Sequence, residues 1–172
     1  KTRMERLSQR PEAFIRRSPA GHTLGGVARR TRESMLIAEA AGFDIVLVET
    51  VGVGQSETTV SRMTDMFLLM LLPGGGDELQ GIKRGIVELA DMILVNKADG
   101  DLQLTAEMSV TDYRKALMFM HPRSANWEVP VEACSALSGK ETARTWEIME
   151  RFRDSQQKAG LIEKNRAAQA RD

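Results

Sequence analysis

The sequence predicts an α/β fold in which helices flank a mostly parallel sheet. Three short and continuously apolar runs predict buried strands, at residues 45–48, 66–72 and 92–95. Segments with helical spacing of apolar residues alternate with these runs, and this alternation is typical of a parallel sheet. Polar residues follow two of the runs directly, at the edge where a parallel sheet binds its ligands.

The composition limits the class of protein. The 172 residues are the size of one ordinary domain, and 24 Lys plus Arg balance 24 Asp plus Glu. A net charge of zero gives no electrostatic argument for a nucleic-acid or membrane partner. The longest apolar stretch, Met66–Leu72, is too short to span a bilayer. The single cysteine, Cys134, excludes an internal disulfide and a multi-cysteine zinc site, so we expect a reduced, cytosol-like protein.

The N-terminal third predicts one helix and one strand. The basic segment Lys1–Pro19 allows two interpretations: a solvated stretch that is partly helical over Thr2–Gln9, or a mobile loop near phosphates. Residues 27–41 have helical periodicity, and Gly42 is placed to end that helix. Asp44–Glu49 is the clearest strand, because four large aliphatic residues between two acids indicate burial on both faces.

The rest of the chain continues the alternation. Acidic residues at 77 and 78 suit a helix start, because they complement the helix dipole. The predicted elements, in chain order, are a short helix at Glu57–Asp65, a strand at Met66–Leu72, a helix from Asp77 to about Leu89, a strand at Met92–Val95, a helix at Ala106–Met120, a strand at Val129–Cys134, and a helix from near Glu141 with Trp146, Met149 and Phe152 on one face. Beyond Gln156 the chain is polar and alanine-rich.

Glu49 and Gly52 suit a sensor for a terminal phosphate. An acid at the end of a strand can hold a water bound to Mg²⁺, and a glycine three residues later lets the backbone approach a phosphate closely. The alternative is a glycine-rich turn that leads into the next helix.

Asn96-Lys97-Ala98-Asp99, which follows the Met92–Val95 strand, suits a guanine base. The Asp99 carboxylate can accept hydrogen bonds from the ring N1–H and the exocyclic amine, which adenine lacks at that edge. The Lys97 stem can lie along the base, and the Asn96 amide can tie neighbouring loops together. A second loop, Ser135-Ala136-Leu137, has backbone amides that could meet the guanine carbonyl. The alternative is a strand that ends in an ordinary polar turn.

Four longer segments resemble the MeaB/ArgK/methylmalonic aciduria A family of P-loop GTPases, whose members have also been labelled LAO/AO transport ATPases. The segments are Lys1–Met4, Thr23–Glu33, Glu49–Glu57 and Asp77–Lys83, and the resemblance covers roughly Lys1 to Phe152. It implies a P-loop NTPase-like sheet and a GTP-hydrolysing chaperone, with GTP or GDP and Mg²⁺ as ligands. The implied client is an adenosylcobalamin-dependent acyl-CoA mutase of the methylmalonyl-CoA mutase type.

The resemblance also implies roles for single residues. Asn96, Lys97 and Asp99 would bind guanine, with Ser135, Ala136 and Leu137 completing the base pocket. Glu49 and Gly52 would belong to the phosphate-sensing switch, with Glu49 holding Mg²⁺ through water. Asp77, Gln80 and Lys83 would form a third switch that the mutase uses to accelerate hydrolysis. Family members are typically homodimers, located in the bacterial cytoplasm or the mitochondrial matrix.

One family motif is absent from the 172 residues. The Gly-x-x-x-x-Gly-Lys-Ser/Thr phosphate loop occurs nowhere in them, and in the family it lies upstream. We therefore expect residues 1–155 to be the C-terminal part of a GTPase domain, and 156–172 to be a polar helical tail or the start of a dimerisation extension. Without a phosphate loop, this chain alone should not be a competent GTPase.

Two other functions compete with this interpretation. A metal-insertion GTPase for nickel enzymes shares the same sheet, but it needs cysteine or histidine ligands near its switch loops, and residues 49–57 contain none. A non-catalytic interaction module could use the helix at residues 77–84 to bind a partner, although it leaves Asn96–Asp99 unexplained. No residue favours a transport kinase over a GTPase.

Overall fold

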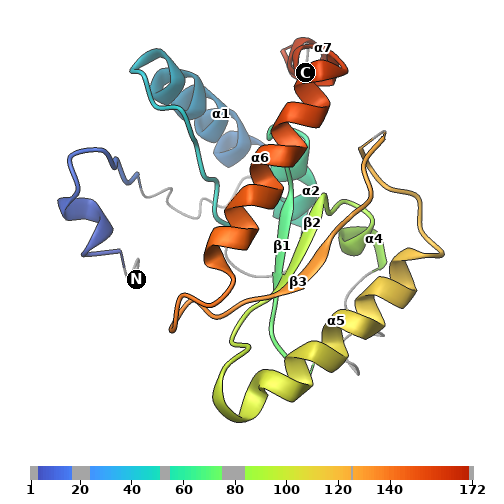
Figure 1. Ribbon diagram of the computed structural model, residues 1–172. Coiled ribbons are helices and arrows are strands. Elements are labelled where there is room, and N and C mark those ends of the chain that lie inside the picture. Colours follow the sequence, from blue (N-terminus) through green and yellow to red (C-terminus); the bar gives the residue numbers. More distant parts are fainter. Residues whose placement is uncertain (1–3, 17–23, 51–54, 75–83, 125, 171–172) are drawn as a thin grey trace. The chain divides into compact units, whose positions relative to one another are not determined.

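The structure is a computed structural model, and it describes residues 4–16, 24–50, 55–74, 84–124 and 126–170 (Figure 1). The chain divides into two units, Lys1–Val51 and Gly52–Asp172, and each is described by itself. Among the described helices, none is long and apolar enough to cross a membrane.

The described part of the second unit contains a parallel sheet of three strands, which lie within the predicted strands at 66–72, 92–95 and 129–134. The strands are β1 (Leu68–Leu71), β2 (Met92–Val95) and β3 (Val131–Ala133). Both pairings are parallel and the order is β1-β2-β3, so β2 is the central strand. The parallel α/β class is therefore confirmed.

Helices cover both faces of this sheet. All four residues of β2 are buried, and because side chains alternate along a strand they enter two different cores. The second and fourth residues pack in the core that includes α5 (Gln103–Leu117), and the first and third in the core that includes α6 (Thr142–Lys158). Burial on both faces explains why β2 is continuously apolar rather than alternating.

The other described elements agree with the predicted order, with shifts at their ends. Helix α1 ends at Ala40 and is followed by Gly42 at a φ of +92°, as predicted for a C-terminal cap. Beyond α6 the chain turns at Gly160 and forms a further helix, α7. The remaining elements are α1 (Leu24–Ala40), α2 (Gln55–Ser61), α4 (Arg84–Val87), α7 (Leu161–Gln169), and the 3-10 turns η1 (Leu7–Gln9) and η2 (Gly100–Leu102).

The prediction of a strand at Asp44–Glu49 is wrong. These residues have no regular secondary structure, and the Ile45 and Leu47 side chains are 52% and 83% exposed. A strand needs a neighbour for its backbone hydrogen bonds. The described part of the Lys1–Val51 unit contains no other strand that could pair with it.

Two finer predictions are also corrected. Met66–Leu72 is predicted to be a buried strand, but only Leu68–Leu71 is strand and Met70 is 55% exposed; among the described strands, β1 has a neighbour on one side only. Trp146 is 42% exposed, whereas Ile148, Phe152 and Gln156 form the buried stripe of α6. That stripe has the spacing of four residues that a helix face requires.

Candidate functional site

The loop that follows β2 begins with an abrupt turn of the backbone. The backbone N–H of Asn96 donates a 2.9 Å hydrogen bond to the Leu71 carbonyl, which extends the parallel ladder by one residue. Lys97 then has a φ of +64°, a left-handed conformation that few residues other than glycine adopt. After this turn Lys97 is exposed, Ala98 is buried and Asp99 is partly exposed.

The Asn96 side chain connects this loop to the one that follows β3. Its Oδ1 accepts hydrogen bonds from the backbone N–H groups of Lys97 at 2.8 Å and Ala136 at 3.1 Å. The Cys134 thiol also donates to it, with an Sγ–Oδ1 distance of 3.8 Å. Asn96 therefore holds the two loops in one arrangement.

Ser135 orients the Asp99 carboxylate. Its side chain is fully buried, and its hydroxyl donates to Asp99 Oδ2 while it accepts the Ser138 backbone N–H at 3.1 Å. The Ser135 carbonyl accepts the Gly139 N–H at 2.9 Å, which closes the loop after β3. A buried serine held on both sides has little freedom, so the carboxylate that it contacts has a defined direction.

This arrangement can bind a flat ring that carries two adjacent N–H groups. An ionised carboxylate only accepts hydrogen bonds, and its two oxygens can receive two parallel donors. The Leu137 side chain is 89% exposed and Lys97 is exposed beside Asp99, so both are available to cover a ring. Guanine presents the required pair of donors. The structure brings together Asn96, Asp99, Ser135 and Ala136, and their role in guanine binding stays a prediction.

Of the predicted phosphate and switch residues, the structure describes only Glu49. Glu49 is exposed and lies in the Lys1–Val51 unit. The predictions for Gly52, Asp77, Gln80 and Lys83 fall outside the described residues. Within the described ranges, no three His, Cys, Asp or Glu side chains gather as metal ligands would.

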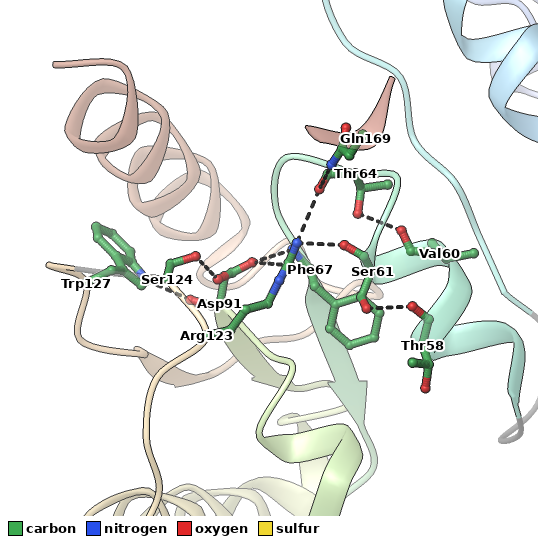
Figure 2. A network of polar contacts seen from close by, with 10 residues as sticks. All are labelled: Thr58, Val60, Ser61, Thr64, Phe67, Asp91, Arg123, Ser124, Trp127 and Gln169. Carbon is green, nitrogen blue, oxygen red and sulfur yellow. Dashed lines mark hydrogen bonds and ion pairs between the residues drawn. The ribbon is translucent and has the colours of Figure 1, made fainter. Parts of the chain in front are cut away.

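A polar network at the opposite end of β2 was not predicted. Asp91, directly before β2, is fully buried and accepts hydrogen bonds from Arg123 Nη1 at 2.8 Å, Ser124 Oγ at 2.5 Å and the Phe67 amide at 2.8 Å (Figure 2). The Trp127 indole N–H donates to the Asp91 carbonyl at 2.8 Å. The network joins the start of the central strand to the segment before β3.

The pKa of the Asp91 carboxyl is raised by burial, since a charge is poorly solvated there. The hydrogen bond from Ser124, the Arg123 charge and the Phe67 amide lower the same pKa and partly oppose burial. Arg123 and Ser124 lie in the segment that follows α5, and no local sequence pattern relates them to Asp91. The one signal in the sequence is an acid directly before a fully apolar strand. Burial also raises the pKa of the Cys134 thiol.

The family model described as "Methylmalonyl Co-A mutase-associated GTPase MeaB" matches residues 1–172. A Caulobacter vibrioides protein whose name describes it as a GTPase is 54% identical over 169 residues. The match covers 98% of this chain and 52% of that protein. The mouse protein "Methylmalonic aciduria type A homolog, mitochondrial" is 47% identical over 98% of this chain and 41% of its own length. The Escherichia coli "GTPase ArgK" is 43% identical over 99% of this chain and 51% of its own length.

Among solved structures, the crystal structure of an LAO/AO transport system kinase matches with a TM-score of 0.84 and 38% sequence identity. The match covers 95% of this chain and 51% of that one. The chain therefore spans about half the length of the relatives that it resembles.

Proposed function

Because this chain belongs to the MeaB family of methylmalonyl-CoA mutase-associated GTPases, we propose that it forms the guanine-reading part of a protein that hydrolyses GTP to GDP and phosphate. The observation that carries this proposal is the Asp99 carboxylate, which Ser135 orients at the carboxyl end of the central strand. Ligands of parallel sheets bind at that edge. Asn96 supports the proposal, because it holds the Ser135–Leu137 loop beside Asp99.

Phosphate binding in this proposal involves a segment that the 172 residues do not contain. We infer that a preceding part of the complete protein carries the phosphate loop, whose backbone amides and lysine would surround the β- and γ-phosphates. Glu49 and Gly52 would sense the γ-phosphate. An exposed carboxylate such as Glu49 suits Mg²⁺, which keeps several waters and takes one or two carboxylates together with phosphate oxygens. The ion would neutralise charge on the phosphates during hydrolysis.

The partner in this proposal is an adenosylcobalamin-dependent acyl-CoA mutase. The family description names methylmalonyl-CoA mutase, and the mouse relative is named for methylmalonic aciduria. Asp77, Gln80 and Lys83 would contact the mutase, and hydrolysis would accompany loading of its cofactor and its protection. The complete protein would be a homodimer, with residues 1–155 as part of the GTPase domain and 156–172 leading towards the dimer contacts. Its compartment would be the bacterial cytoplasm or the mitochondrial matrix.

Nucleotide binding tests the proposal. We expect the complete protein to bind GTP at least about 100-fold more tightly than ATP, as measured by titration calorimetry, because ATP leaves the Asp99 carboxylate unpaired. The 172-residue chain alone should bind GTP far more weakly, since it has no phosphate loop. Equal affinity for GTP and ATP would contradict the proposal, whereas a protein that binds neither nucleotide would favour a non-catalytic interaction module.

Replacing Ser135 by alanine tests how the carboxylate is oriented. The loss of one hydrogen bond to a charged acceptor should weaken GTP binding roughly tenfold and leave ATP binding unchanged. Ser138→Ala is the matched control, because it removes a hydroxyl from the same loop but keeps the backbone N–H that Ser135 accepts. Equal GTP dissociation constants for the two variants would show that Ser135 does not position Asp99.

A further inference from the structure

The turn between α2 and β1 contacts helix α7. Arg166 in α7 makes a bidentate ion pair with Asp65, with Nε–Oδ1 and Nη2–Oδ2 distances of 2.9 and 2.5 Å. Gln169, at the end of α7, donates its side-chain N–H to the Thr64 carbonyl at 3.4 Å. Asp65 and Arg166 are 101 residues apart in the sequence, so these contacts are tertiary.

The described side chains of helix α7 are mostly exposed. It has nine residues, and none of them is buried. Its apolar residues Leu161 and Ile162 are only half-buried. Gly160, at a φ of +65°, separates it from α6 and lets the chain change direction there. The polar contacts with the turn therefore contribute to the order of this helix.

The same turn is fixed to the sheet from the other side. Arg123 donates through Nη2 to the carbonyls of Ser61 at 2.6 Å and Thr64 at 3.4 Å, while its Nη1 is paired with the buried Asp91. The Thr64 carbonyl therefore accepts from both Arg123 and Gln169 (Figure 2). Ser61 is the last residue of α2, so the Thr64 carbonyl lies between the end of α2 and helix α7.

We propose that α7 is a releasable strap that docks on the turn at residues 61–65 and restrains the C-terminal end of α2. The contacts that hold it are exposed, with side-chain exposures of 49% for Arg166 and 33% for Asp65, so salt and solvent compete with them. The contacts of Arg123 with Asp91 are more buried and keep the turn in place when α7 leaves. In sequence, α2 follows the segment to which phosphate sensing is assigned, but the docking itself does not depend on that assignment.

Amide hydrogen exchange on the complete protein without nucleotide tests this strap. Asp65→Asn keeps the size of the side chain and removes its charge. The backbone amides of residues 161–169 should then exchange roughly fivefold faster or more, with a smaller acceleration at residues 59–61. Raising the salt concentration from 50 to 500 mM should do the same in the unchanged protein and have little further effect in the variant.

Two further variants make the test specific. Arg153→Gln removes an exposed ion pair with the adjacent Asp154 on α6, and it should leave exchange at 161–169 unchanged. Exchanging the charges in the double variant Asp65→Arg/Arg166→Asp should restore slow exchange. If Asp65→Asn leaves exchange at 161–169 unchanged, the docking is refuted. If α7 is released while residues 59–61 keep their exchange rates, the restraint on α2 is refuted. Neither outcome bears on GTP binding.

Discussion

Replacing Asp99 by alanine is expected to reduce the preference of the complete protein for GTP over ATP by about 100- to 1000-fold. In the unchanged protein the guanine N1–H and exocyclic amine would both donate to the Asp99 carboxylate, which a hydrogen bond from Ser135 orients. Alanine leaves both groups without this acceptor. Dissociation constants for GTP and ATP, measured by titration calorimetry, give the preference directly.

A second variant separates loss of recognition from loss of folding. Asp99→Asn replaces one acceptor oxygen by an N–H donor, which should bind a base that carries a carbonyl in place of the exocyclic amine, as xanthine does. This variant should therefore lose affinity for GTP and gain affinity for xanthosine triphosphate. Asp101→Ala removes an exposed acid two residues away and serves as the control. If Asp99→Ala prefers GTP as strongly as the unchanged protein, the interpretation of Asn96–Asp99 as a base reader is wrong.

The central strand shows what could be predicted from local sequence. Four consecutive apolar residues at 92–95 indicate burial on both faces, and the structure buries all four in a parallel sheet. The polar residues after them could likewise be placed at the carboxyl edge. The left-handed backbone at Lys97 could not be predicted, since lysine has no preference for that conformation, and the contacts of Asn96 with the next loop impose it.

Asp44–Glu49 shows where the same signal fails. Its apolar pattern is as strong as that of residues 92–95, yet no strand forms there. The pattern reports that the residues suit burial, whereas a strand also needs a neighbour for its backbone. Met92–Val95 has a neighbour on each side and Asp44–Glu49 has none in the described part of its unit.

The Asp91 network could not be predicted because its members are distant in sequence. Arg123 is 32 residues from Asp91 and 62 from Ser61, and no local spacing connects them. A buried acid is recognised only when its partners are known, because burial alone is unfavourable for the charge. Removing a partner from this network should therefore reduce the stability of the fold substantially.

Replacing Arg123 by alanine is expected to lower the free energy of unfolding by about 3–5 kcal/mol, because it leaves the Asp91 charge buried without its ion-pair partner. It also leaves the Ser61 carbonyl without this donor. Urea unfolding of the 172-residue chain at pH 7 measures the change. Fluorescence is a suitable signal, since Trp127 donates to the Asp91 carbonyl and packs edge-on against Phe152 at 5.1 Å.

The pH dependence of the free energy of unfolding shows whether the instability of Arg123→Ala comes from the buried Asp91 charge. Because burial raises the pKa of Asp91 in the folded chain, the protonated form favours folding: this contribution is fully present below about 3.8 and is lost as the pH rises through the raised value. Arg123 lowers that pKa, so its removal should raise it further. The stability difference between the unchanged chain and Arg123→Ala should therefore shrink as the pH falls from 7 towards 4. A difference that stays constant would indicate lost packing instead.

Two controls complete this experiment. Arg153→Ala removes an exposed arginine that pairs with its neighbour Asp154, and it should change the free energy of unfolding very little. The double variant Arg123→Met/Asp91→Asn removes both charges and should recover much of the loss, because no unpaired ion is left in the core. If Arg123→Ala costs no more than Arg153→Ala, Asp91 does not depend on Arg123, and the turn at residues 61–65 must be held to the sheet by other contacts.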